Sequence, residues 1–208
     1  MKVLLINGSS RKNGCTFTAL TEVEKTLNAE NIETELIHTG SEAIRDCTGC
    51  GYCKKGGGKC VFNDDIVNEI IEKAKNSDGF IFGSPVYYAH PSGRLLSLTD
   101  RLFYAGSGAF AFKPAAAVVS ARRAGTTASL DAIMKHFTIN QMPVISSNYW
   151  NMVHGNTPDE VMQDKEGLQI MRTLGHNMAW ILKCIDLGKN SGINHPQTEE
   201  KIWTNFIH

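Results

Sequence analysis

The sequence predicts an α/β fold with a doubly wound, five-stranded parallel sheet, formed by a single domain that spans all 208 residues. Short apolar runs of strand length alternate with longer stretches of helical periodicity, which is the pattern of repeated β-α-β units. The hydrophobic content of 42% is enough for one substantial core. No internal repeat, low-complexity tract or Pro/Ser-rich linker divides the chain.

Short apolar runs place the expected strands at residues 3–6, 36–37, 80–82, 115–119 and 143–146. The first helix is expected over residues 16–29, where Phe17, Leu20, Val23 and Leu27 recur at intervals of three or four. Later helices are expected from Asp64 and Asp65 to about residue 78, from Pro91 to about residue 104, and over residues 127–139.

A C-terminal helical extension is expected over residues 158–208, with one long helix inside it. Its buried face is formed by Leu168, Met171, Leu174, Met178, Ile181 and Ile185. Cys184 lies among these residues and is expected to be a core thiol. Five strands with intervening helices resemble a flavodoxin-like doubly wound sheet, whose strand order the spacing does not reveal.

The charge of the chain excludes some classes of partner. The 21 basic and 21 acidic residues give a formal net charge of zero, so no overall field recruits nucleic acid or an acidic membrane. No stretch approaches the roughly 18 consecutive apolar residues of a membrane span. The first apolar run is too short for the core of a signal peptide, and we expect a cytoplasmic protein.

Three loops follow expected strands, at the sheet edge where ligands bind in doubly wound folds. Residues 7–16, NGSSRKNGCT, offer backbone N–H groups, hydroxyls and Arg11 to a phosphate, although serine and asparagine also serve simply to turn and cap a helix. Residues 83–93 carry adjacent tyrosines that are suited to a flat ring system or to packing. In residues 120–125, SARRAG, the arginines stabilise an anion or are solvated surface groups.

Together, and in this order, the three loops resemble the NADPH-dependent FMN reductase family of flavodoxin-like proteins. The resemblance implies that the first loop holds the FMN phosphate and that the other two flank the isoalloxazine ring. The cofactor-binding residues it implies are Ser9, Ser10, Arg11, Asn13, Gly14, Cys15, Thr16, Ser84, Pro85, Val86, Tyr87, Tyr88, Ser120, Ala121, Arg122, Arg123 and Gly125.

Residues 47–60, CTGCGYCKKGGGKC, place four cysteines at C-x2-C-x2-C-x6-C spacing. Structural zinc is usually held by two separated C-x2-C pairs, whereas consecutive x2 spacing lets one loop wrap a cuboidal cluster. We therefore favour a [4Fe–4S] cluster over zinc, and both over disulfides, which need an oxidising compartment. The expected metal ligands are Cys47, Cys50, Cys53 and Cys60.

This cysteine loop also resembles that of the iron–sulfur flavoproteins, a branch of the same family. The resemblance implies a homo-oligomer, a dimer or tetramer, in which electrons pass between cluster and FMN across a subunit interface. Lys54, Lys55 and Lys59 lie beside the thiolates and either dock an acidic carrier such as ferredoxin or only keep the loop soluble. NAD(P)H is the other candidate electron donor.

The expected function is an FMN-dependent oxidoreductase that passes electrons between FMN and a [4Fe–4S] cluster. Two alternatives stay open: an NAD(P)H-dependent FMN or quinone reductase with zinc or nothing in the cysteine loop, and a flavin-binding redox sensor without turnover. No residue is assigned as catalytic. Cys15 lies at a helix start that could lower its pKa, although packing is its simpler role, and Trp150 either walls the flavin site or packs.

Overall fold

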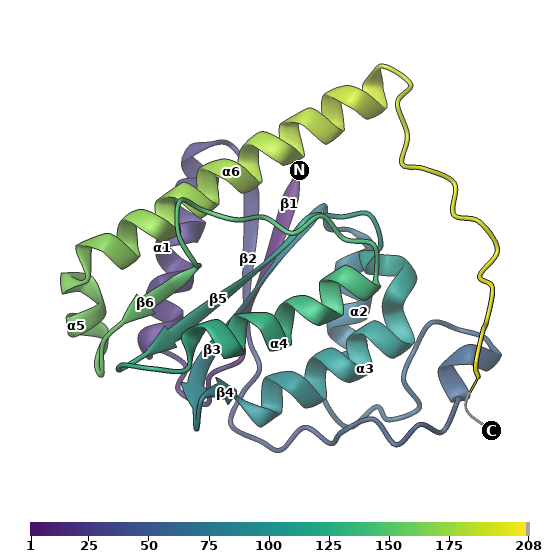
Figure 1. The fold of residues 1–208 in the computed structure, drawn as a ribbon, viewed down its shortest axis with the longest axis horizontal. Helices are drawn as coiled ribbons and strands as arrows, with labels where there is room; N and C mark the ends of the chain where they lie inside the picture. Colours follow the sequence, from purple (N-terminus) through teal and green to yellow (C-terminus); the bar gives the residue numbers. More distant parts are fainter. Residues whose placement is uncertain (207–208) are drawn as a thin grey trace.

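The computed structural model describes residues 1–206 and contains a parallel sheet with helices on both faces (Figure 1). The strand order is β2-β1-β3-β5-β6, and β4 pairs antiparallel with β3 beside this path. The strands are β1 (Lys2–Asn7), β2 (Glu33–His38), β3 (Gly79–Tyr87), β4 (His90–Pro91), β5 (Ala115–Ala121) and β6 (Met152–His154). The flavodoxin-like doubly wound fold predicted from the sequence is confirmed, and the chain reverses its winding between β1 and β3.

The helices divide between the two faces of the sheet. One face carries α1 (Cys15–Ala29), α5 (Pro158–Gln163) and α6 (Lys165–Asn190). The other carries α2 (Val67–Lys75), α3 (Gly93–Phe110) and α4 (Thr126–Ile139), with a short 3-10 turn, η1 (Tyr52–Lys55), in the loop between β2 and α2.

Two apolar cores lie on the two faces of the sheet because successive strand residues point in opposite directions. In β1, Leu4 and Ile6 belong to the core under α2, α3 and α4, whereas Val3 and Leu5 belong to the core under α1 and α6. A strand buried on both faces reads as a continuous apolar run, as residues 3–6 do.

The expected fifth strand at residues 143–146 is wrong in its position. Val144 makes one isolated parallel bridge to Ala115, but the ladder with β5 is formed by β6, where Met152 pairs with Val119. Four residues of β5 thus separate the two pairings, while eight separate them on the partner side. Four extra residues bulge from the sheet edge in the polar, aromatic stretch SSNYWN.

Pro91 does not open α3, contrary to the expectation from sequence. It lies in β4, where it pairs with Val86 of β3, and the helix begins at Gly93. Ser92 is the N-cap because its hydroxyl accepts a hydrogen bond from the backbone N–H of Leu95 at 3.2 Å. The helix continues past residue 104 to Phe110, with a kink at Gly106 where α2 packs closely against it.

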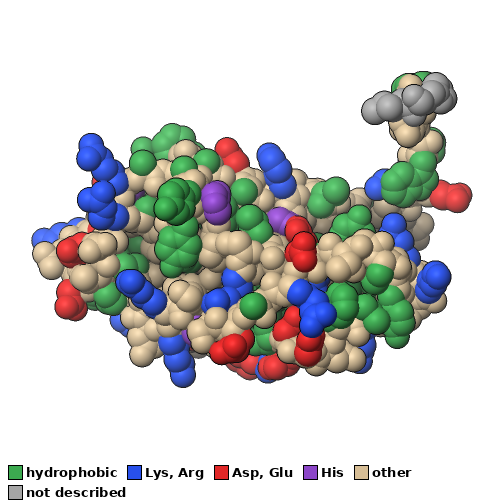
Figure 2. Space-filling model, turned by 90° about the horizontal axis from the view of Figure 1, so that it is seen from below, with side chains coloured by type: hydrophobic (Ala, Val, Ile, Leu, Met, Phe, Trp, Pro, Cys, Tyr) green, Lys and Arg blue, Asp and Glu red, His purple; other side chains and the backbone are tan. Residues whose placement is uncertain are grey.

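The C-terminal extension predicted over residues 158–208 is helical only as far as Asn190. Residues 191–206 have no regular secondary structure and are exposed; the segment runs from the end of α6 back toward η1 (Figure 1), with His195 stacked on Phe112, and its last part stands out in the view of Figure 2. Residues 207 and 208 of the predicted extension lie outside the described residues. Cys184 is exposed, so its expected core position is wrong, because two residues after the buried Leu182 a helix faces the other way.

Within residues 1–206, none of the helices combines the length and the apolar character needed to cross a bilayer.

The packing of α6 against α1 depends on Gly175. A Cβ placed on Gly175 would lie 2.7 Å from the Cβ of Thr26, whereas one placed on Gly108 of α3 would meet nothing within 4 Å. We expect Gly175→Ala to lower the free energy of unfolding by about 1–3 kcal/mol through overpacking. Gly108→Ala, the matched control, should raise it by about 0.5–1 kcal/mol because alanine favours the helix. Urea unfolding followed by circular dichroism measures both, and shifts of the same sign would contradict the close packing at Gly175.

Candidate functional site

The loops that follow β1 and β3 meet at the carboxyl edge of the sheet and are joined by hydrogen bonds. The N–H of Gly8 donates to the carbonyl of Gly83 at 2.9 Å. The hydroxyl of Ser92 donates to the carbonyl of Gly8 at 2.8 Å, and the N–H of Ser92 donates to the hydroxyl of Ser84 at 2.9 Å. Ser84 and Ser92 are buried, so these bonds fix the second loop against the first.

The first loop is shaped by its own polar side chains. The side-chain oxygen of Asn7 accepts from the N–H of Ser9, and the hydroxyl of Ser9 accepts from the N–H of Arg11, both at 3.1 Å. Ser9 is buried and serves the loop's own structure, whereas Ser10, Arg11 and Asn13 are exposed. The polar groups that this loop presents to solvent therefore sit on a backbone that is already ordered.

The loop leads into the N-terminus of α1, where Gly14 is the N-cap and no side chain caps the first turn. The N–H groups of that turn are therefore directed at the space beyond the helix start, the arrangement that binds anions. The hydroxyls of Thr16 and Ser120 lie 2.9 Å apart and are both buried. Their hydrogen bond joins the first loop to the third.

The second and third loops also touch each other. In the turn between β3 and β4, Tyr88 and Ala89 adopt left-handed backbone angles, with φ of 50° and 63°, and the Tyr88 side chain is fully exposed. A Cβ placed on Gly125, whose φ is 91°, would lie 2.5 Å from the Cα of Ala89, so only glycine allows this approach. Strained turns of this kind cluster at binding sites.

The remaining predicted residues of these loops occupy different depths. Pro85 and Val86 are half-buried in β3, and Ala121 is buried at the end of β5. Tyr87, Arg122 and Arg123 are exposed. The structure thus brings all three loops to one edge of the sheet.

Cys15 and Trp150, whose roles the sequence left open, both make packing or hydrogen-bond contacts in the structure. Burial raises the pKa of the Cys15 thiol, so the lowering considered from its place at a helix start does not occur. The thiol lies 3.7 Å from the carbonyl of Gly155, to which it donates. Trp150 precedes β6 at the outer edge of the sheet, where its ring packs edge-on against Tyr149 with centroids 4.7 Å apart.

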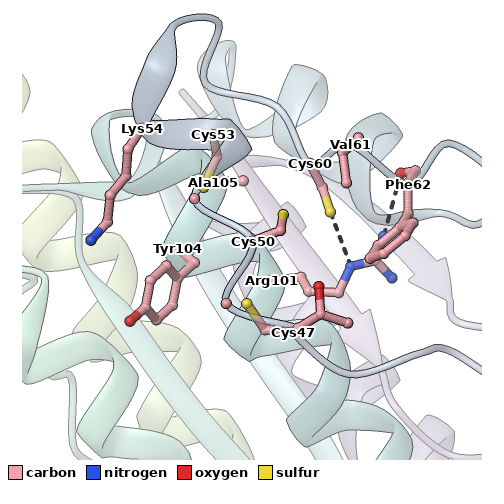
Figure 3. A pocket seen from close by; sticks show the side chains of 13 residues that line it. Cys47, Cys50, Cys53, Lys54, Cys60, Val61, Phe62, Arg101, Tyr104 and Ala105 are labelled. Atoms are coloured by element: carbon pink, nitrogen blue, oxygen red, sulfur yellow. Dashed lines mark hydrogen bonds between the residues drawn. The ribbon is translucent and has the colours of Figure 1, made fainter.

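The four cysteines of the 47–60 loop line one cavity of about 90 Å³ (Figure 3). The loop bends over α3, and Gly49 and Gly51, with φ of 64° and 69°, supply left-handed turns between the first three cysteines. Arg101 and Tyr104 of α3 complete the wall. All four cysteines are free thiols, and within residues 1–206 no three His, Cys, Asp or Glu side chains are grouped to hold one metal ion.

Comparison with known proteins decides the family. The family model described as NADPH-dependent FMN reductase matches residues 1–157. The chain belongs to this family. An iron–sulfur flavoprotein of Methanocaldococcus jannaschii is 36% identical over 194 residues, covering 89% of this chain and 99% of the relative. A second from the same organism is 30% identical over 201 residues, covering 88% and 98%.

These relatives place the chain in the iron–sulfur flavoprotein branch of the FMN reductase family, as its motifs predicted. An archaeal flavodoxin of known structure has a TM-score of 0.59 at 15% identity, covering 88% of this chain and 99% of that protein, and shows the same fold. As a family member, the flavoprotein is an FMN-dependent oxidoreductase.

The residues present fit FMN. The uncapped start of α1 and the exposed Arg11 suit a phosphate, and the exposed tyrosines and arginines of the other loops suit a planar ring that becomes anionic. Sequence reasoning missed Ser92, which joins two of the loops, and Arg101 of α3, which donates a hydrogen bond to the Cys60 sulfur. The spacing could have indicated that Arg101 is buried, because it places this arginine on the same helical face as the apolar Leu98 and Ala105.

The phosphate assignment of Arg11 has a direct test. Arg11→Ala should weaken FMN by about tenfold or more, because a hydrogen bond to a charged group contributes roughly 1.5–3 kcal/mol. Riboflavin, which lacks the phosphate, should bind with unchanged affinity. Fluorescence titration of the flavin-free protein measures both, with Lys25→Ala on α1 as the control for lost charge. Equal weakening of the two flavins would remove Arg11 from the phosphate site.

Proposed function

We propose that this flavoprotein passes electrons between FMN and a [4Fe–4S] cluster held by Cys47, Cys50, Cys53 and Cys60. The observation that carries the proposal is that all four thiols surround one cavity while no three of them converge on a point. A single tetrahedral zinc ion, with Zn–S bonds near 2.3 Å, needs its sulfurs about 3.8 Å from one another. Ligands spaced around a volume suit a cuboidal cluster instead.

The chain's own residues would hold FMN at the carboxyl edge of the sheet. The first-turn N–H groups of α1 and Arg11 bind the phosphate, while residues 84–88 and 120–125 lie along the ring. Arg122 and Arg123 offset the negative charge that a flavin gains on reduction. Bound FMN supplies both one-electron and two-electron chemistry, and the cluster supplies one-electron chemistry.

The distance between the two sites supports a homo-oligomer, a dimer or tetramer. Ser92 lies at the flavin edge, and Arg101 and Tyr104 line the cysteine cavity, so the two sites are about 14 to 18 Å apart along α3 at 1.5 Å per residue. Electron tunnelling weakens steeply with distance, so the FMN of a second subunit is the better partner. Exposed Tyr52, Val61 and Tyr104 beside the cysteines suit such an interface.

The electron donor would be either an acidic protein carrier, such as ferredoxin, or the nucleotide NAD(P)H. Lys54, Lys55 and Lys59 are exposed beside the cysteines. Lys59 lies 3.3 Å from Glu72 and Lys54 lies over the ring of Tyr104, so Lys55 is the lysine best placed for an acidic partner. Because a thiolate-held cluster also favours a reducing compartment, a cytoplasmic location is part of the proposal.

Anaerobic purification of the full chain, followed by iron, sulfide, zinc and FMN assays on one sample, tests the proposal. We expect about four irons, four sulfides and one FMN per chain. Cys50→Ser should abolish iron and sulfide binding but leave FMN bound, because the two sites are separate. Cys184→Ser is the matched control, since Cys184 is also exposed but lies on α6, and it should change neither cofactor.

Three results would contradict the proposal. Zinc with FMN and no sulfide would make the cysteine loop a structural metal site in a flavin or quinone reductase. Loss of FMN together with iron in Cys50→Ser would show that the two sites depend on each other. A protein that carries both cofactors but reduces none of several electron acceptors would instead be a redox sensor.

A further inference from the structure

We propose that Arg101 is a positioning residue that raises the reduction potential of the cluster by donating a hydrogen bond to the Cys60 sulfur, while Asp65 limits this effect. The inference rests on the proposed cluster. It concerns a side chain outside the cysteine motif, on a helix that the motif does not include.

Arg101 is almost completely buried, with 1% of its surface exposed. Its Nε lies 3.3 Å from the Sγ of Cys60, to which it donates. Both terminal nitrogens donate to the carboxylate of Asp65. They also donate to the backbone carbonyls of Arg45 at 3.2 Å and Phe62 at 3.4 Å. All five N–H groups of the guanidinium therefore have a partner.

This arrangement requires arginine rather than any cation. A planar fork reaches a sulfur on one side and a carboxylate on the other, which the single ammonium of lysine does not reproduce. The guanidinium stays charged under all conditions in which the protein folds. The guanidinium of Arg101 also lies over the ring of Phe62, with its central carbon 5.4 Å from the ring centroid, and this cation–π contact further limits the movement of the Arg101 side chain.

A donor aimed at a ligand sulfur stabilises the additional negative charge of a reduced cluster more than the oxidised form. The carboxylate of Asp65, itself only 10% exposed, opposes this because it is a negative charge held beside the same guanidinium. The two side chains should therefore shift the potential in opposite directions: Arg101 upward and Asp65 downward.

A purely structural role, in which Arg101 only ties the loop to α3, is the alternative explanation. Arg94 supplies the matched control because it lies on the same helix and donates to the carbonyls of Gly40 and Ser41 in the same connection, without a bond to a cysteine among its described contacts. Arg94→Met removes a tether but leaves the sulfur hydrogen bond in place.

The experiment is a potentiometric titration of the anaerobically purified holoprotein, with the cluster followed by EPR and FMN followed by absorbance. The double variant Arg101→Met/Asp65→Leu removes the sulfur donor without changing net charge or leaving a buried charge unpaired. We expect its equilibrium constant for one-electron cluster reduction to fall about tenfold, a shift of about 59 mV. Arg94→Met should leave the cluster potential unchanged, and the FMN potentials should be unchanged in both variants.

Two single variants test the direction of each contribution. Arg101→Lys keeps the charge but loses the fork, so its cluster potential should fall. Asp65→Asn should raise the potential, because it removes the opposing charge and leaves Arg101 in place. A merely structural role predicts cluster loss or potential shifts of one sign in all the variants, Arg94→Met included.

The proposal is overturned if the double variant keeps its cluster at the wild-type potential, or if Asp65→Asn lowers that potential. If the double variant holds no cluster, Arg101→Lys decides, and loss of the cluster in both would assign Arg101 to assembly alone. Wild-type protein without sulfide would overturn the proposed function itself, whereas a wild-type cluster with indifferent variants overturns only the role of Arg101.

Discussion

The close approach of α1 to β3 at Gly83 is the constraint on which the flavin edge depends. A Cβ at Gly83 would lie 2.7 Å from Leu20 and 2.9 Å from Thr16, so any larger residue would push the helix away from the sheet. With the helix seated, Thr16 reaches Ser120 and the N-terminus of α1 opens beside the third loop. Gly83 also accepts a hydrogen bond from the N–H of Gly8, which follows β1. This bond lies where the winding of the sheet reverses, between β1 and β3.

Helix α3 gives the molecule its second organising element because it serves both sites. Its start is fixed to the flavin edge through Ser92, and Arg94 in its first turn and Arg101 in its middle bind the long connection between β2 and α2. That connection has little regular secondary structure and few buried apolar side chains of its own. The half-buried Arg94 and the buried Arg101 each donate to two backbone carbonyls of this connection, in place of the missing sheet and helix bonds, and Arg101 also holds Cys60 against α3.

Much of the fold follows from the sequence because the strands are buried on both faces and the helices have one apolar stripe. The apolar runs at residues 3–6 and 115–119 indicate buried strands. The spacing from Phe17 to Leu27 indicates a helix with one apolar face. The prediction of a strand at residues 143–146 was wrong because the residues that pair with β5 are interrupted by a bulge and are not continuous in sequence. The prediction that Pro91 opens α3 was wrong because Ser92, directly after it, caps the helix. This choice depends on a local hydrogen bond rather than on composition. The cysteines were found from their spacing, but the partner of Arg101 was not, because Asp65 is 36 residues away in sequence.

The bulge between Val144 and Met152 has a consequence for how the chain behaves among copies of itself. β6 ends the strand order, so its outer side presents unpaired backbone groups that could template pairing with another chain. A strand of three residues, preceded by four extra residues that leave the sheet, offers no long flat edge for such pairing. The irregularity that hides this strand from sequence analysis therefore protects the β6 edge of the sheet against pairing with another chain.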